Sequence, residues 1–295
     1  MSPLPREELD RRYCNAAKFD LKWRIAVGKL LQNLLNHNFV PKGGDAVNIT
    51  TGESNSVLPA YIPYVGKGYF AYAPKVLCYA INQNLSRHVP WTKEWISRWA
   101  ENASCAYDRL NRAFGLGEQL PIRPYAEGFI PLTALIAIWL WTQNRGGSLP
   151  EIVDDVIGVT NFVKFSTVAD ASSSSIPDAW WRESASRYVK HEIMVLQPDI
   201  IVGFGRRTVT ELERVLRNPG FRFCKPTLLG CRFPGRIASN KARQLSEEES
   251  ALWNSIVLPL VKRAKEPRKP KYHRWRMLEF PGYFTDTLKS WRSAL

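Results

Sequence analysis

Four short apolar runs, rich in β-branched and aromatic residues, predict β-strands in this chain. They are Val76–Ile81, Ile152–Lys164, Ile200–Phe204 and Thr227–Cys231. Two of the runs carry amide side chains: Asn82-Gln83-Asn84 follows the first, and Asn161 lies in the second. Because amides interrupt a strand signal, we expect the chain to leave the first strand for a loop at Asn82.

Longer segments with apolar residues at helical spacing alternate with these runs. They span residues 6–39, 91–114, 131–141, 178–196, 208–216 and 246–264. The segment 131–141 is apolar almost throughout, so it is a buried helix or an apolar strand. Strands and helices that alternate in this way favour a mostly parallel sheet with helices on both faces.

The predicted fold class is therefore α/β, a three-layer α/β/α arrangement around a short, mostly parallel four-stranded sheet. We divide the chain into an N-terminal helical and loop extension over residues 1–68, a core over residues 69–264 and a basic C-terminal tail over residues 265–295. No motif residue lies in the tail. We therefore expect truncation after Ala264 to weaken binding of a partner and to leave the chemistry of the core intact.

The positive charge of the chain is concentrated in two segments. Gly205–Arg243 holds ten Lys and Arg against two Glu, and Lys262–Leu295 holds ten against three acidic residues, so together they account for the whole net charge of +14. Neither segment has the apolar face of a membrane-surface helix. Two basic segments on an otherwise neutral chain indicate a polyanionic partner, and they favour nucleic acid over a membrane surface. The alternative is a basic protein without such a partner.

Several classes of protein are disfavoured by composition. The five cysteines form no CxxC pair, which argues against a zinc site or an iron–sulfur cluster, so we expect no metal and no cofactor. The longest apolar stretch, Phe129–Trp141, has 13 residues, fewer than the roughly 20 that span a bilayer. We find no export signal and expect a monomeric, cytoplasmic, nucleoid-associated protein of a bacterium.

The amides at the strand ends are candidate site residues. In open α/β sheets ligands bind outside the carboxyl ends of the strands, where Asn82, Gln83 and Asn84 would lie. Amide groups supply both hydrogen-bond donors and acceptors. Asx turns at a strand end would explain Asn82 and Asn84 equally well.

Taken together, these segments resemble the uracil-DNA glycosylase superfamily over roughly Lys75–Val261, in the family's order. The run VLCYAINQN stands where the mismatch-specific and single-strand-selective types have Gly-hydrophobe-Asn-Pro-Gly, which puts Asn82 on the catalytic asparagine. The run VTNFVKF stands where the thermostable bacterial types have Thr-Asn-hydrophobe-Val-Lys, which puts Asn161 on the residue that reads the base. The run HEIMVLQPDIIVGFGRRT is similar to those families' link from helix to strand to glycine turn.

The chain also departs from the family pattern. Ala80, Gln83 and Asn84 replace the small and turn-forming residues of the first motif, and CRFPGRIASN, in the place of the loop that enters the DNA, has no His-Pro-Ser. The iron–sulfur cysteines of the thermostable types have no counterparts. A member of the fold that binds DNA without excising a base is therefore the main alternative.

The resemblance implies a role for each candidate residue. Asn161 can complement the 4-oxo and N3–H groups of uracil, and Asn82 can orient a water molecule that attacks the sugar. Trp91 resembles the stacking residue of the base pocket, with Trp95 and Phe129 as alternatives. The neighbours of Asn82, which are Ile81 and Gln83, complete the predicted base-binding set.

The basic residues after the third and fourth predicted strands are the candidate DNA contacts. They would bind phosphates around a flipped nucleotide, with Ile237 as a wedge in the vacated stack; the set is Arg206, Arg207, Arg232, Arg236, Ile237, Ser239 and Lys241. A solvated rim without a partner is the plain alternative for the arginines. A metal-dependent nuclease that uses Asp154 and Asp155 is a third hypothesis, which the lack of an accompanying histidine disfavours.

Overall fold

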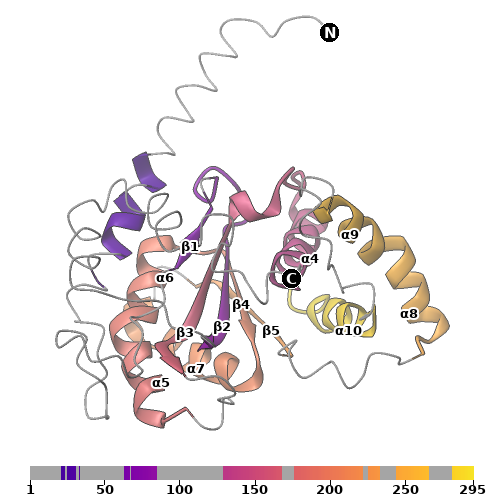
Figure 1. The fold of residues 1–295 in the computed structure, drawn as a ribbon. Helices are drawn as coiled ribbons and strands as arrows, with labels where there is room; N and C mark the ends of the chain where they lie inside the picture. Colours follow the sequence, from indigo (N-terminus) through magenta and orange to yellow (C-terminus); the bar gives the residue numbers. More distant parts are fainter. Residues whose placement is uncertain are drawn as a thin grey trace, which may run out of the picture.

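The computed structural model describes residues 21–23, 25–30, 33, 63–66, 68–84, 129–167, 176–221, 225–232, 244–265 and 281–295. These residues form a mixed α/β fold in which helices pack on a mostly parallel sheet (Figure 1). The predicted fold class is confirmed at that level. The sheet has five strands, however, and not the four that we expected.

The strands are β1 (Tyr64–Val65), β2 (Val76–Asn84), β3 (Ile157–Thr167), β4 (Ile200–Phe204) and β5 (Thr227–Cys231). They lie in the order β1-β3-β2-β4-β5, and every neighbouring pair is parallel except β1 and β3. The strand missing from the prediction is β1. It has two residues, too few to produce a period-2 pattern in the sequence.

The amides Asn82 to Asn84 belong to strand β2, so the expectation of a loop at Asn82 was wrong. Asn82 pairs with Val163 and Asn84 with Thr167, with an irregularity in register between the two pairs. The neighbouring strand β3 continues to Thr167 and offers these backbone groups hydrogen-bond partners. Pairing with a neighbour can therefore override the low β propensity of asparagine.

One face of the sheet is covered by α5 (Asp178–Ser184), α6 (Lys190–Leu196) and α7 (Arg206–Leu216), as Figure 1 shows. The predicted helix over residues 178–196 is confirmed, with a π-helical turn at Ala185–Val189 between α5 and α6. Gly203 of β4 allows α7 to approach closely. A Cβ at that position would lie 3.0 Å from Val209 Cγ2 and 3.1 Å from Leu212 Cδ1.

The opposite face carries α4 (Phe129–Arg145), with α9 (Leu258–Lys265) and α10 (Pro281–Trp291) packed on it. Helix α4 resolves the choice between helix and apolar strand for residues 131–141. It is buried along nearly its whole length because it lies between the sheet and further helices. No helix in the described ranges is both long and apolar enough to cross a bilayer.

Residues 281–295, which we assigned to the basic tail, contain helix α10 and belong to the fold. Phe284, Leu288 and Trp291 repeat at helical spacing and are buried. The indole Nε1 of Trp291 donates to the Gly230 carbonyl at 2.9 Å, and the Tyr283 hydroxyl donates to the Arg232 carbonyl at 2.9 Å. Helix α10 thus satisfies two carbonyls of the edge strand β5 and its continuation, groups that an open edge would leave unpaired.

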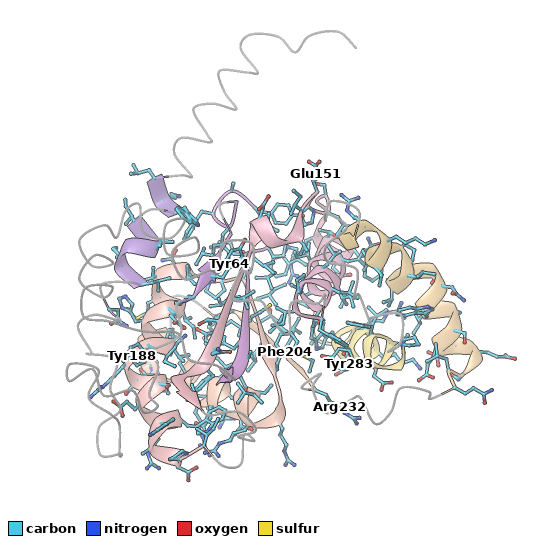
Figure 2. The ribbon with its side chains drawn as sticks, in the orientation of Figure 1. Tyr64, Glu151, Tyr188, Phe204, Arg232 and Tyr283 are labelled. Carbon is cyan, nitrogen blue, oxygen red and sulfur yellow. The ribbon has the colours of Figure 1, made fainter. Side chains whose placement is uncertain are left out.

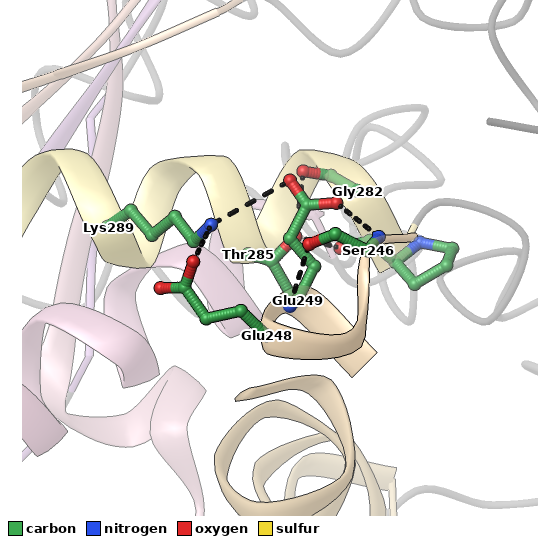
Figure 3. Close-up of polar contacts among 7 residues, drawn as sticks. Ser246, Glu248, Glu249, Gly282, Thr285 and Lys289 are labelled. Carbon is green, nitrogen blue, oxygen red and sulfur yellow. Dashed lines mark hydrogen bonds and ion pairs between the residues drawn. The ribbon is translucent and has the colours of Figure 1, made fainter. Parts of the chain in front are cut away.

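Helix α10 is also joined to α8 (Glu247–Leu252), whose first turn is drawn in Figure 3. Ser246 and Glu249 form a capping box, which satisfies two backbone donors at the start of α8. The ammonium of Lys289 lies 3.2 Å from a Glu248 oxygen and 3.9 Å from a Glu249 oxygen. The acidic first turn and the capping box therefore stabilise the start of α8, and Glu248 and Glu249 also pair with Lys289 of α10.

The N-terminal extension contacts the core as well. Residues 21–23 and 25–30 are helical, and the Trp23 indole donates to the Val65 carbonyl at 2.8 Å. The side-chain amide of Asn33 donates to the Arg187 carbonyl, also at 2.8 Å. Part of this extension is thus bound to β1 and to the π-helical turn.

Candidate functional site

The strand order defines where a ligand of this fold would bind. Numbered along the chain, the four parallel strands lie in the order second, first, third, fourth, so the direction of sheet building reverses between β2 and β4. In open α/β folds ligands bind outside the carboxyl ends of the strands at such a switch point. Here β2 ends at Asn84, and β4 ends at Phe204, just before Gly205.

Asn82 and Asn161 lie on neighbouring strands near this edge. Asn161 pairs with Ala80 and Asn82 pairs with Val163, so position 82 lies two residues further along the sheet than position 161. From the usual rise of about 3.3 Å per residue and strand spacing of about 4.8 Å, their Cα atoms are on the order of 8 Å apart. Because strand positions alternate between faces, positions 80, 82 and 161 belong to the same face.

The Asn161 side chain is buried, with 6% of its surface exposed. Its neighbours Thr160 and Lys164 contact the helix α6 side of the sheet, so Asn161 points toward the α4 side. No described residue donates a hydrogen bond to its carboxamide or accepts one from it. The carboxamide is not one of the fully buried polar groups that lack a partner in the described structure, so its polar atoms keep some contact with solvent and are open to a ligand.

The opposite face behind Asn161 holds a buried charged network. Lys164 Nζ lies 2.5 Å from Glu192 Oε1, and the Tyr79 hydroxyl donates to Glu192 Oε2 at 3.1 Å. The Lys164 ammonium also donates to the Thr160 hydroxyl. Lys164 and Glu192 have side-chain exposures of 0% and 3%. We refer to Tyr79, Thr160, Lys164 and Glu192 as the Glu192 network.

Burial controls the protonation of this network. It lowers the pKa of Lys164 and raises the pKa of Glu192, and the attraction between the two opposes both shifts. Burial is also the main reason why the pKa of Tyr79 lies well above its ordinary value, and the Glu192 carboxylate raises it further. The Lys164 ammonium faces away from Asn161 and is sequestered from solvent, so it cannot act as a nucleophile at the candidate site.

The turn after β4 combines a glycine and two arginines. Gly205 has φ of +93°, a conformation that side chains rarely adopt, and it precedes α7 without a side-chain cap. The first turn of α7 therefore directs unpaired N–H groups and a positive dipole end toward the carboxyl edge of the sheet. Arg206 is exposed, and no ion pair joins it to another described residue.

Arg207 has a structural role in addition to any contact with a partner. Its guanidinium pairs with Asp178 and lies 4.6 Å from the centre of the Trp181 ring. These contacts join the start of α7 to α5. Of the two arginines after Gly205, Arg206 is therefore the one whose side chain is available.

Arg232 follows β5 and is exposed, while its carbonyl is held by Tyr283 (Figure 2). Burial raises the pKa of Tyr283 well above its ordinary value and that of the nearby Cys231 thiol to about 12. Phe129 stacks on Phe284 at 5.5 Å and meets Tyr283 edge to face at 5.7 Å. Its ring is thus engaged with α10, which makes Phe129 the weaker alternative for stacking on a base.

Several predicted site residues lie outside the described part of the chain. They are Trp91, Trp95, Arg236, Ile237, Ser239 and Lys241, whose roles stay predictions. The backbones of Asn82 and Gln83 are described as strand. Ile81 is partly buried and packs against the core.

Neither the Glu192 network nor Tyr283 was predicted from the sequence. A lysine at the end of an apolar strand and a glutamate inside the run HEIMVL were signals that two charges are buried. Their pairing, however, joins positions 28 residues apart, which local patterns do not reveal.

The positions of Asp154 and Asp155 do not support the nuclease hypothesis. Asp154 and Asp155 lie in a 3₁₀ turn before β3, at the amino end of that strand and away from the switch-point edge. Within the described ranges no three His, Cys, Asp or Glu residues form a group that could hold a metal ion.

Comparisons with family models, with curated proteins and with solved structures find no match to this chain.

Proposed function

We propose that this protein is a monofunctional DNA glycosylase that flips uracil or a related deaminated base out of DNA and hydrolyses its N-glycosidic bond. The observation that carries the proposal is the register of β2 and β3. It brings position 82 and the buried, unpartnered Asn161 onto one face of adjacent strands at the switch-point edge. These are the two residues to which the sequence resemblance gives the catalytic and base-reading roles.

Asn161 supplies the recognition. Its carboxamide donates to the 4-oxo group of uracil and accepts from N3–H, two contacts that cytosine cannot make with the same orientation. Burial strengthens such discrimination, because a mismatched polar pair inside the protein is left unsatisfied. The flipped base thus satisfies an amide that has no partner among the described residues.

Asn82 supplies the orientation of the attacking water. An amide oxygen accepts a hydrogen bond from water but does not remove its proton at neutral pH, so bond cleavage depends on an oxocarbenium-like sugar. The described lysine nearest to Asn161 in sequence is Lys164, which is bound to Glu192 on the opposite face. A hydrolytic mechanism without a Schiff base fits that arrangement.

The positive groups at the same edge supply affinity for DNA. Arg206, the start of α7 and Arg232 lie at the carboxyl ends of β4 and β5, where they would bind phosphates on either side of the flipped nucleotide. In this proposal the protein acts as a monomer on the DNA of the nucleoid. Helices on the two sides of the sheet form the outer layers of an α/β/α fold.

An alkali-cleavage assay tests the proposal. The protein is incubated with a labelled oligonucleotide that contains one uracil, and the product is analysed with and without alkali. We expect cleavage only after alkali, because excision of the base leaves an alkali-sensitive abasic site. Cleavage without alkali would instead indicate a lyase or nuclease.

A catalytically impaired glycosylase fold that binds DNA is the second candidate. The observation that favours it is the strand pairing of Asn82 and Asn84, which replaces the turn expected after the first motif. In the same assay this candidate gives binding of the oligonucleotide and no cleavage under either condition. Xanthine- and hypoxanthine-containing oligonucleotides extend the test to other deaminated bases.

A further inference from the structure

The half of β3 that carries Asn161 has little support on its outer side. Strand β1 pairs only with Gly158 and Val159, so from Thr160 onward the described sheet offers β3 one neighbouring strand, β2. The outward N–H of Lys164 is bound instead by the Ser184 hydroxyl of α5, at 3.1 Å. Among the described residues, side chains of the covering helices and not a second strand contact this half of β3.

The Glu192 carboxylate supplies that support, because its two oxygens bind two different strands. Oε1 pairs with Lys164 of β3, and Oε2 accepts from Tyr79 of β2. Lys164 lies three residues after Asn161, and Tyr79 lies three residues before Asn82. One side chain of α6 thus joins the two strands that carry the candidate site residues, from the face behind them.

Stability alone does not explain these charges. A buried ion pair gains little over well-packed apolar side chains of similar volume, because removing both charges from water offsets most of their attraction. The apolar surroundings, with the rings of Phe162 and Trp181 5.3 Å apart, would accept such a replacement. What the ion pair adds is direction, since a carboxylate fixes the positions of its donors and an apolar contact does not.

We propose that Glu192, Lys164 and Tyr79 are positioning residues, which set the placement of β2 relative to β3 and thereby the distance between Asn82 and Asn161. The inference rests on the proposed function for its catalytic consequence. Its structural part, the restraint of the two strand ends, stands independently. Both parts can be measured on the same variants.

The test variant replaces the ion pair as a unit, Lys164→Met with Glu192→Leu, so that no buried charge is left alone. The matched control is Arg187→Met with Glu183→Leu. This second pair also lies in the α5–α6 layer, with nitrogen and oxygen 2.5 Å apart, but it joins residues i and i+4 of one helical segment and no strand. Both variants should melt within a few degrees of the wild type.

Hydrogen exchange followed by mass spectrometry gives the readout that does not depend on activity. In the test variant we expect faster exchange, by about 10-fold or more, in peptides that cover β2 and β3, and no change in β4. The control variant should leave β2 and β3 at the wild-type rate. Unchanged exchange of β2 and β3 in the test variant would overturn the proposal, whatever the protein does to DNA.

Single-turnover excision of uracil at saturating protein gives the second readout. Misplacing a reacting group by about 1 Å can cost up to about 10²-fold, so we expect the test variant to lose at least about 10-fold in rate while its affinity for DNA is unchanged. Tyr79→Phe, which removes one arm of the network, should lose less. A wild-type protein that excises no base would refute the proposed function and leave the exchange experiment decisive for the network.

Discussion

The two faces of the sheet are formed by alternate residues of the same strands, and they differ in how their polar side chains are paired. On the α6 side, Tyr79 and Lys164 bind one buried carboxylate, and the Thr160 hydroxyl accepts a hydrogen bond from the Lys164 ammonium. On the α4 side, Asn161 is buried and has no described partner. A shift of register by one residue would exchange the two sets.

The motif VTNFVK therefore has two roles. Thr160, Phe162 and Lys164 lie on the side of α5 and α6, where Phe162 packs on Trp181 and Lys164 pairs with Glu192, and Asn161 between them faces the candidate site. Lys164, which sequence similarity alone would group with Asn161, belongs to the other side of the sheet. Changes to the Glu192 network should therefore act through stability and strand placement, whereas changes to Asn82 and Asn161 should act on the attacking water and on the base.

The largest effect should come from removing α10, which covers the α4 side. Burying large aromatic side chains such as Trp291 and Phe284 contributes about 3–5 kcal/mol each, and a domain of this size has only about 5–15 kcal/mol in total. Truncation at Phe280 should therefore give insoluble or unfolded protein by circular dichroism. The exposed Arg292→Ala on the same segment should change stability by less than about 0.5 kcal/mol. A soluble, cooperatively folded truncation would instead support the expectation from the sequence that this segment is a basic tail that strengthens binding of a partner without contributing to the core.

The next effect concerns the α6 side. Glu192→Leu alone leaves the Lys164 ammonium buried without its counter-ion, which should destabilise the protein by about 3–5 kcal/mol in urea unfolding. Adding Lys164→Met should recover most of that loss. If the single and double variants are equally unstable, the carboxylate contributes through packing and not through charge.

On the α4 side, Asn82→Ala should lower single-turnover excision by about 10²-fold and leave DNA affinity nearly unchanged, as expected for a lost positioning group. Asn82→Asp should keep or gain activity, because a carboxylate both activates water and stabilises a cationic sugar. Asn84→Ala, which alters another amide of the same strand, is the control. Excision at the wild-type rate by Asn82→Ala would place catalysis elsewhere.

Asn161→Asp tests base recognition. Ionised, it presents only acceptors, which repel the 4-oxo group of uracil and suit the amino group of cytosine. We expect a loss of uracil excision of about 10²-fold, matching about 3 kcal/mol for an unsatisfied buried contact, and weak excision of unpaired cytosine. Asn161→Ala should lose uracil excision without the gain. An unchanged preference for uracil would show that Asn161 does not touch the base.

The smallest effect should come from changing a single arginine at the carboxyl edge of the sheet. If about five phosphates are bound, the logarithm of the DNA association constant should fall with the logarithm of the salt concentration with a slope of roughly −4 to −5. Arg206→Ala should reduce the size of that slope by about 1. Arg214→Ala is the control, since Arg214 is exposed on the same helix and pairs with Glu211. Equal slopes for all three proteins would remove Arg206 from the interface.

Local sequence patterns determined most of the elements. Strands β4 and β5 were predicted with their observed bounds because each is a short apolar run between breakers such as Pro198 and Gly205. The helical segment 178–196 and a helix that begins at Ser246 were also predicted, since apolar periodicity acts over a few residues. Asn161 could be singled out because a polar residue in an apolar strand is unusual.

Contacts between residues that are distant in the sequence became visible only in the folded protein. The sequence does not show that Glu192 binds Tyr79 and Lys164 at separations of 113 and 28 residues, or that β1 adds a fifth strand. The many basic residues near α10 led us to predict a tail there, although α10 has a short apolar face. That face packs on the core and places Trp291 so that it donates to the edge strand β5. The sequence shows that residues of β3 alternate between two faces. It does not show which of the two groups of residues faces the Glu192 carboxylate. Strand pairing and helix packing determine that, because the burial of a side chain depends on its neighbours in space.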